Sequence, residues 1–143
     1  MQNLLPNVKV SLPAIAAGSA GSLVAGATVD MDGYEGVLLL TRISTANAGN
    51  FLKAQQGDQA DGSDASDLAG TATVAAADGD LVVLDVYRPT GRYVRPVIDR
   101  SGTNTATGDV YALRYGGRLS PQDNNVADVI VSKLVSSPSE GTP

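Results

Sequence analysis

The sequence contains no cysteine, no histidine and no tryptophan. Without cysteine there is no disulfide, no thiolate nucleophile and no zinc site with sulfur ligands. Without histidine the chain lacks the most common general base, the Ser-His-Asp arrangement and imidazole metal ligands. The sequence therefore predicts a protein that is not an enzyme, with no catalytic, cofactor-binding or metal site.

Aromatic residues are also scarce, at 4% of the 143 residues, while 43% of the residues are apolar. The core must therefore be built from Val, Leu, Ile and Ala. The net charge of −5 argues against non-specific nucleic-acid binding. The N-terminal stretch does not look like a signal peptide, and no run approaches the roughly 18 apolar residues of a membrane span. We expect neither a nucleic-acid partner nor a membrane partner.

Residues 81–99 form the most informative stretch, with two apolar runs joined by the four residues Arg88-Pro89-Thr90-Gly91. Runs rich in Val, Ile, Leu and Tyr on both sides of such a turn predict a β-hairpin with a type I turn. The alternation places Val82, Leu84 and Val86 on one face. Pro96 cannot donate to a ladder of hydrogen bonds, so it marks a sheet edge or a bulge.

Further strands are predicted from apolar runs and alternation. They cover residues 8–12, 22–29 with an interruption at Gly26, 36–43 with both faces buried, 50–56 at a sheet edge, 71–77, 110–115 and 126–135. One short helical turn is expected near Ser63. The pattern predicts an all-β single domain over residues 8–135, a jelly-roll-like antiparallel sandwich of about eight strands. Residues 1–7 form an N-terminal arm and residues 136–143 a C-terminal tail.

Acidic residues recur every three positions at Asp58, Asp61, Asp64 and Asp67. This spacing is not that of an EF-hand, so a solvated loop is the main interpretation and a cation site the alternative. Asp85 is the only acid inside a strongly apolar run. We expect it to face solvent or to pair with an arginine such as Arg95.

Arginines are concentrated in the second half of the chain, with six among residues 88–118. Arginine forms bidentate pairs with carboxylates and is enriched at protein interfaces. The candidate interface residues are Arg88, Arg92, Arg95, Arg114 and Arg118, and those near the turn at 88–91 are expected to meet acidic surfaces.

Several segments together resemble small virion proteins of tailed bacteriophages, of the capsid decoration (cement) type. These segments are VDMDGYEGV (29–37), LKAQQ (52–56), SDASDLAGT (63–71), DVYRP (85–89), RYVR (92–95), ALRYG (112–116) and SPSEGT (137–142). The resemblance implies a late-expressed structural protein, made in the host cytoplasm and located in the virion. It also implies a jelly roll, a homotrimer, and binding to the major capsid protein so as to stabilise contacts between capsomers. Strand addition by the arm or the tail would supply backbone hydrogen bonds between subunits.

Other functions stay open at the level of the sequence. A head–tail connector, a neck component or a tail-associated protein would share the same composition. A carbohydrate-binding or hydrolytic β-sandwich is a less favoured alternative, because His and Trp are absent. A calcium-dependent adhesion module built on residues 57–70 is the last alternative.

Overall fold

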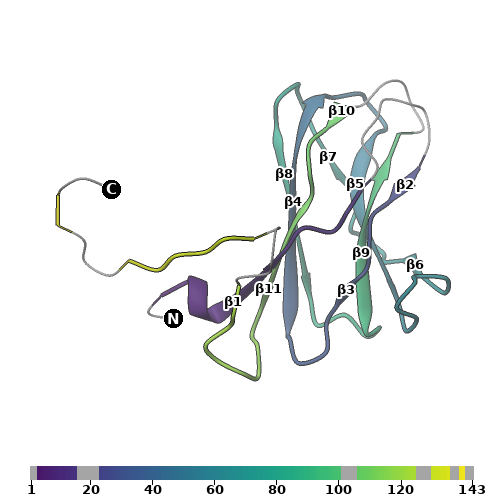
Figure 1. Cartoon of the computed structure of the whole chain (residues 1–143). Coiled ribbons are helices and arrows are strands. Elements are labelled where there is room, and N and C mark those ends of the chain that lie inside the picture. Colours follow the sequence, from purple (N-terminus) through teal and green to yellow (C-terminus); the bar gives the residue numbers. More distant parts are fainter. Residues whose placement is uncertain (1–2, 16–22, 101–105, 125–129, 136–138, 141–143) are drawn as a thin grey trace.

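Two antiparallel sheets pack face to face in the computed structural model, which describes residues 3–15, 23–100, 106–124, 130–135 and 139–140 (Figure 1). We call them the β4 sheet and the β9 sheet. The β4 sheet contains β1 (Val8–Ser11), β11 (Tyr111–Tyr115), β4 (Gly36–Thr45), β8 (Leu81–Tyr87) and β10 (Ala106–Thr107). The β9 sheet contains β2 (Val24–Ala25), β3 (Val29–Asp30), β9 (Tyr93–Asp99), β5 (Phe51–Gly57), β6 (Ser66–Asp67) and β7 (Thr73–Val74). A single 3₁₀ turn, η1 (Leu5–Asn7), precedes β1.

The pairing order is that of a long hairpin wound into a roll. β1 pairs with β11, β2 and β3 with β9, β4 with β8, and β5 with β6 and β7. Each strand from the first part of the chain, β1 to β5, thus pairs with one from the later part, β6 to β11, from the outermost pair to the innermost, and successive pairs alternate between the two sheets. Because β2 and β3, β6 and β7, and β10 and β11 each continue one line against a shared neighbour, the eleven strands occupy eight strand positions. This confirms the predicted antiparallel sandwich and matches the strand arrangement of a jelly roll.

The core lies between the two sheets and is almost entirely aliphatic. β4 contributes Val37, Leu39 and Ile43, all at most 3% exposed. β8 alternates strictly, with Val82, Leu84 and Val86 buried as predicted. From the opposite sheet, the core residues are Leu52 and Ala54 of β5 and Val94 and Ile98 of β9. Alternation along each strand therefore places one face of each sheet against the other.

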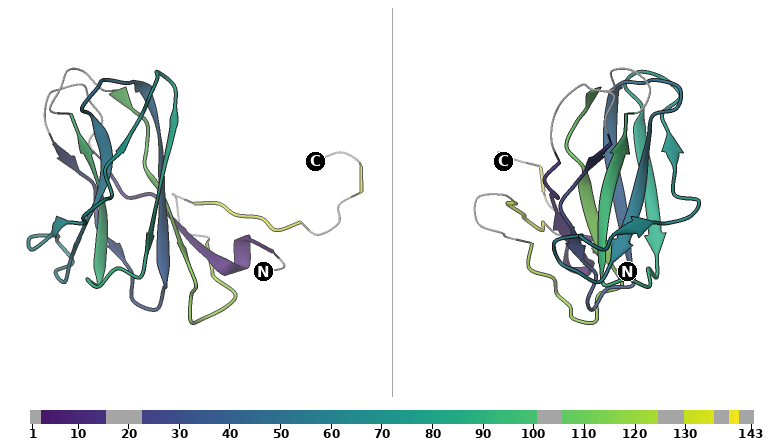
Figure 2. Two further views of the ribbon diagram at one scale, coloured as in Figure 1. Left: turned by 180° about the vertical axis from the view of Figure 1, so that it is seen from behind. Right: turned by 90° about the vertical axis from the view of Figure 1, so that its right-hand side faces the viewer.

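The predicted hairpin between β8 and β9 is wrong, because the two strands belong to different sheets (Figure 2). All seven residues of β8 pair with β4. The connecting loop crosses the end of the sandwich, and Arg88 in it has a positive φ of 51°. Side chains at the end of β5 hold this loop: Gln56 accepts hydrogen bonds from the backbone N–H groups of Thr90 and Gly91. Those long-range bonds replace the local bond of a type I turn.

The strand expected at a sheet edge over residues 50–56 is a central strand, and so is β9, where Pro96 predicted either an edge or a bulge. β5 lies between β9 and the β6–β7 line, and β9 lies between β5 and the β2–β3 line. Pro96 is tolerated in β9 because it faces the interruption between β2 and β3, where the Gly26 N–H donates to its carbonyl at 2.8 Å. A side chain at Gly26 would overlap the Pro96 ring. The interruption expected at Gly26 is therefore confirmed, and it accommodates the proline.

The remaining differences concern the loop at Ser63 and the end of the chain. No helical turn forms near Ser63. Residues 131–135 are not in a strand, so the strand predicted at 126–135 is wrong over that part, and residues 126–129 lie outside the described residues. Residues 130–135 project away from the sandwich on the side of the β4 sheet (Figures 1 and 2). Among the described residues, no helix has the length and apolar character needed to span a membrane.

Candidate interaction surface

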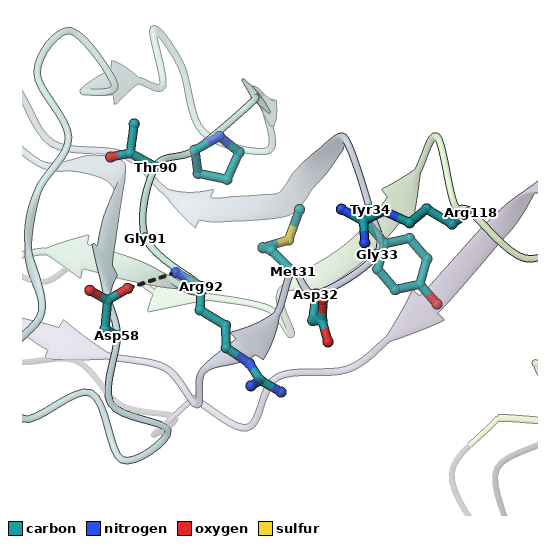
Figure 3. A pocket seen from close by; sticks show the side chains of 10 residues that line it. Met31, Asp32, Gly33, Tyr34, Asp58, Thr90, Gly91, Arg92 and Arg118 are labelled. Atoms are coloured by element: carbon teal, nitrogen blue, oxygen red, sulfur yellow. Dashed lines mark hydrogen bonds between the residues drawn. The ribbon is translucent and has the colours of Figure 1, made fainter.

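Two of the predicted interface arginines, Arg92 and Arg118, line a shallow depression at one end of the sandwich. The loop from Met31 to Tyr34 supplies part of its wall, and Asp58 lies on the other side (Figure 3). The depression has a volume of about 360 Å³. Asp58 accepts a hydrogen bond from the Arg92 backbone N–H at 3.1 Å, so this carboxylate serves the fold of the loop.

Arg92 is engaged within the chain. Its guanidinium donates to both carboxylate oxygens of Asp30, at 3.1 and 2.9 Å. This bidentate contact lowers the pKa of the Asp30 carboxyl, with a smaller opposing effect from burial. The same pairing raises the pKa of the Arg92 side chain. Arg92 therefore joins β3 to the loop before β9 rather than presenting an unpaired charge.

Arg114 is a structural residue. It lies over the Tyr34 ring, 4.7 Å from the centroid. Its guanidinium donates to the Asp30 carbonyl at 2.7 Å and to the Ser11 hydroxyl at 2.9 Å. Burial lowers the pKa of this side chain. Arg114 thus links β11, β1 and the end of β3, and it is not displayed for a partner.

The other three arginines are dispersed. Arg95 lies on the outer face of β9 and donates to Gln55 at 2.8 Å. Arg88 is exposed, 3.8 Å from Glu35 and stacked on Tyr87 at 5.1 Å. Arg118 is exposed, and its side chain makes no hydrogen bond or ion pair with the described residues. The five arginines do not form one patch; Arg88 and Arg118 are exposed, and of these two only Arg118 has no ion pair with the described residues.

The acidic loop at 57–70 uses its carboxylates to hold its own backbone. Asp64 accepts hydrogen bonds from the N–H groups of Asp58 and Gln59, and Asp61 accepts one from Ser63. Asp67 forms an ion pair with Lys53 at 2.7 Å. Each of these contacts lowers the pKa of the accepting carboxyl. Within the described residues, no group of three or more acidic side chains is arranged to hold a metal ion.

The outer face of the β4 sheet is largely apolar, and the described residues leave most of it uncovered; Val8, at 5% exposure, and Gly36 are its buried members. Cross-strand pairing sets Tyr111 beside Leu40 and Leu40 beside Val83. The next row toward the other end contains Val10, Leu113, Leu38 and Asp85, and the last row contains Val8, Tyr115, Gly36 and Tyr87. Several members are strongly exposed: Leu81 at 61%, Tyr87 at 57%, Val83 at 45% and Tyr111 at 45%. We call this surface the apolar face; contiguous patches of this kind mark interaction sites.

Asp85 is the one acid within the apolar face. It accepts a hydrogen bond from the Tyr115 hydroxyl at 2.7 Å. Burial and the Asp85 carboxylate raise the pKa of the Tyr115 phenol, so the phenol stays a donor at neutral pH. Arg95 lies in the other sheet, so the suggested pairing of Asp85 with Arg95 is wrong, whereas its orientation toward solvent is confirmed.

The apolar face was missed at the sequence level, although the signal was present. β8 reads Leu-Val-Val-Leu-Asp-Val-Tyr, and half-buried strands normally alternate apolar with polar residues. When the side chains on both faces of a strand are apolar, the strand is expected to have apolar neighbours on both faces. The described chain supplies a neighbour on only one of them.

No protein-family model matches the chain, and neither a curated protein nor a solved structure matches it significantly. The resemblance to virion proteins of tailed phages therefore stays a prediction.

Proposed function

We propose that this chain is a structural protein of a tailed-phage virion, which binds the outside of the capsid shell as a decoration protein. The observation that carries the proposal is the apolar face, because a soluble domain rarely leaves most of one sheet surface apolar without a partner to cover it. The resemblance in seven sequence segments names the partner as the major capsid protein. The sandwich supplies a rigid scaffold and the apolar face the contact area.

Stabilisation of the shell would come from repetition. A single sheet face of this size gives a modest interface, but a copy that contacts two capsomers at once gains from the high effective concentration of its second contact. Arg88 and Arg118 lie at the end of the sandwich and would contact acidic groups at the rim, where charges affect orientation and association rate more than affinity.

Binding to purified shells that lack the protein tests the apolar face. Val83 on β8 is 45% exposed and Val74 on β7 is 53% exposed, so the two valines form a matched pair. Val83→Lys should weaken binding at least about tenfold, since a charge would be buried without a partner. Val74→Lys, on the other sheet, should bind like the wild type. Equal binding by both variants would contradict a role for the apolar face.

Copy number separates a shell protein from a connector. Quantitative mass spectrometry of purified virions should find the protein at hundreds of copies, comparable with the major capsid protein. A count of about a dozen would instead indicate a ring at the neck or tail, because connectors follow the local rotational symmetry.

A further inference from the structure

The four edges of the sandwich are not protected equally. At β1, the Asn124 side chain occupies the edge: it accepts from the Val10 N–H at 2.7 Å and donates to the Val8 carbonyl at 2.8 Å. In the β9 sheet, both edges consist of two-residue pieces, which are too short to template another strand.

The β8 edge has none of these protections. β8 is seven residues long and pairs with β4 along its whole length. On its other side it has no strand partner among the described residues. Asp85 is its only charge. A long apolar edge strand of this kind is a template for pairing with another chain.

A groove runs beside this edge. Its volume is about 360 Å³, with β8 residues from Leu84 to Tyr87 on one wall and Leu68 to Thr71 on the other. A strand of six residues is about 20 Å long, close to the length of β8. The groove therefore offers room on the side of β8 where backbone groups are unpaired.

The chain also carries an apolar segment that its own sandwich does not cover. Residues 131–135 read Val-Ser-Lys-Leu-Val, follow the half-buried and bridged Ile130, and extend from the body beside the β4 sheet (Figure 1). Val131 is 96% exposed, and Leu134 and Val135 are 52% and 53% exposed. Lys133 is the only charge in the segment.

We propose that residues 131–135 of one copy add as a strand to the free edge of β8 in a second copy. The charges fix the register, with Lys133 opposite Asp85. Val131 and Val135 lie two positions before and after Lys133, and Val83 and Tyr87 lie two positions before and after Asp85. The two valines therefore lie opposite Val83 and Tyr87 whether the strands run parallel or antiparallel. Opposite charges and paired apolar side chains are the favourable cross-strand neighbours.

A second copy fits this role better than the same chain. Asn124, just before the segment, is anchored at β1, the opposite edge of the same sheet. The chain's own β8 lies three strand spacings away, about 14 Å, across the apolar face, whereas residues 131–135 extend away from the sandwich rather than across that face (Figure 1). A tail-to-edge contact joins two different surfaces, so repetition gives a ring where the rotation closes. The inference concerns the isolated protein and is independent of shell binding.

Cysteine crosslinking tests the contact directly, because the natural sequence has no cysteine. Asp85→Cys and Lys133→Cys chains are prepared separately, mixed and mildly oxidised. We expect a disulfide-linked dimer containing one chain of each kind on a non-reducing gel. Asp85→Cys mixed with Ser139→Cys, whose cysteine lies outside the pairing segment, is the control and should give much less dimer. Absence of the mixed dimer, or a disulfide that forms only within a chain carrying both cysteines, overturns the proposal.

Hydrogen exchange provides a readout that leaves β8 unaltered. Proline lacks the N–H that a ladder needs, so Lys133→Pro should expose the β8 amides that point away from β4 and raise their exchange rates at least about tenfold. Ser139→Pro is the matched control and should keep the wild-type rates. Equal rates in all three proteins, or protection of β8 that appears only on shells, would overturn pairing with a second copy.

Discussion

The two outer faces of the sandwich differ more than any other pair of regions in the molecule. On the β9 sheet, Arg95 bonds to Gln55, Gln55 bonds to Asp67, and Asp67 pairs with Lys53. On the β4 sheet, most of the corresponding positions are Leu, Val and Tyr, with Arg42 and Ser44 near one end, and a side-chain hydrogen bond joins Tyr115 to Asp85. On the outer face of the β9 sheet, polar side chains bond to one another. On the outer face of the β4 sheet, apolar side chains are in contact with water.

Coverage explains the difference. Val97 points outward from β9, between Ala25 and Lys53, yet it is 0% exposed. The loop at 57–70 also lies against this side, since the Thr28 hydroxyl donates to the Ala60 carbonyl and the Arg95 guanidinium adjoins Gly62. The chain thus covers much of the β9 face by itself, although Val74 stays 53% exposed. Most of the apolar face has no such cover from the described residues, which is why we assign it to a partner.

The largest expected effect separates the core from the apolar face. Leu39 is 0% exposed between the sheets, and Leu39→Ala should lower the free energy of unfolding by about 2–5 kcal/mol. Val83→Ser, on the apolar face of the neighbouring strand, should cost less than about 1 kcal/mol in the isolated protein. Urea denaturation measures both. A loss at Val83 as large as that at Leu39 would mean that the apolar face is already covered in the free protein.

The second effect compares two arginines that are four positions apart in the sequence: Arg114 is partly buried and hydrogen-bonded, and Arg118 is exposed. Arg114→Ala removes two charge-assisted hydrogen bonds and the stacking on Tyr34, so it should cost about 1–3 kcal/mol of unfolding free energy. Arg118→Ala, at an exposed and unpaired side chain, should stay within about 0.5 kcal/mol of the wild type. Thermal or urea unfolding distinguishes them. Equal stability of the two variants would remove the structural role assigned to Arg114.

Local pattern predicted the strands well because alternation and turn residues act over a few positions. The buried set of β8 and the break at Gly26 both follow from the sequence. Sheet membership does not follow, because it depends on contacts far apart in the chain. The loop at 88–92 resembles a hairpin turn locally, but bonds to residues more than 30 positions earlier, including Gln56 and Asp58, hold it across the end of the sandwich.

The same limit applied to the candidate site. A cluster of arginines indicates an interface when the side chains are free, but the sequence does not show that Asp30 and Tyr34 lie beside Arg92 and Arg114. Asn124 at the β1 edge has no sequence signal, because an asparagine in a polar loop is ordinary. The apolar residues of β8 did carry a signal, which was assigned to a hairpin partner instead of to an outer surface.

A smaller effect tests whether the row of the apolar face that contains Gly36 and Tyr115 contacts the shell. Tyr115 lies over Gly36, and a Cβ at that position would overlap the phenol end of the ring. Because the ring is half exposed and can swing outward, Gly36→Ala should cost under about 1 kcal/mol of stability. The Tyr115–Asp85 bond would be lost, and binding to shells should weaken. Gly108→Ala is the control, since its nearest contact is 3.7 Å away. Unchanged shell binding by Gly36→Ala would show that the partner does not contact this row.

The smallest effect is the loss of stability at low pH that comes from the ion pair between Arg92 and Asp30. Arg92 holds the pKa of Asp30 below its usual value of 3.8 in the folded protein. The unfolded chain therefore takes up the proton first, so this contribution to stability is complete above about pH 4 and is lost as the pH falls through the lower folded pKa. The pair is half exposed, which keeps the effect below about 1 kcal/mol. In urea unfolding at pH 5 and pH 3, Asp30→Asn and Arg92→Ala should both lose less stability on acidification than the wild type does. Identical losses in all three proteins would mean that the bond between Arg92 and Asp30 does not contribute to the stability of the polar face.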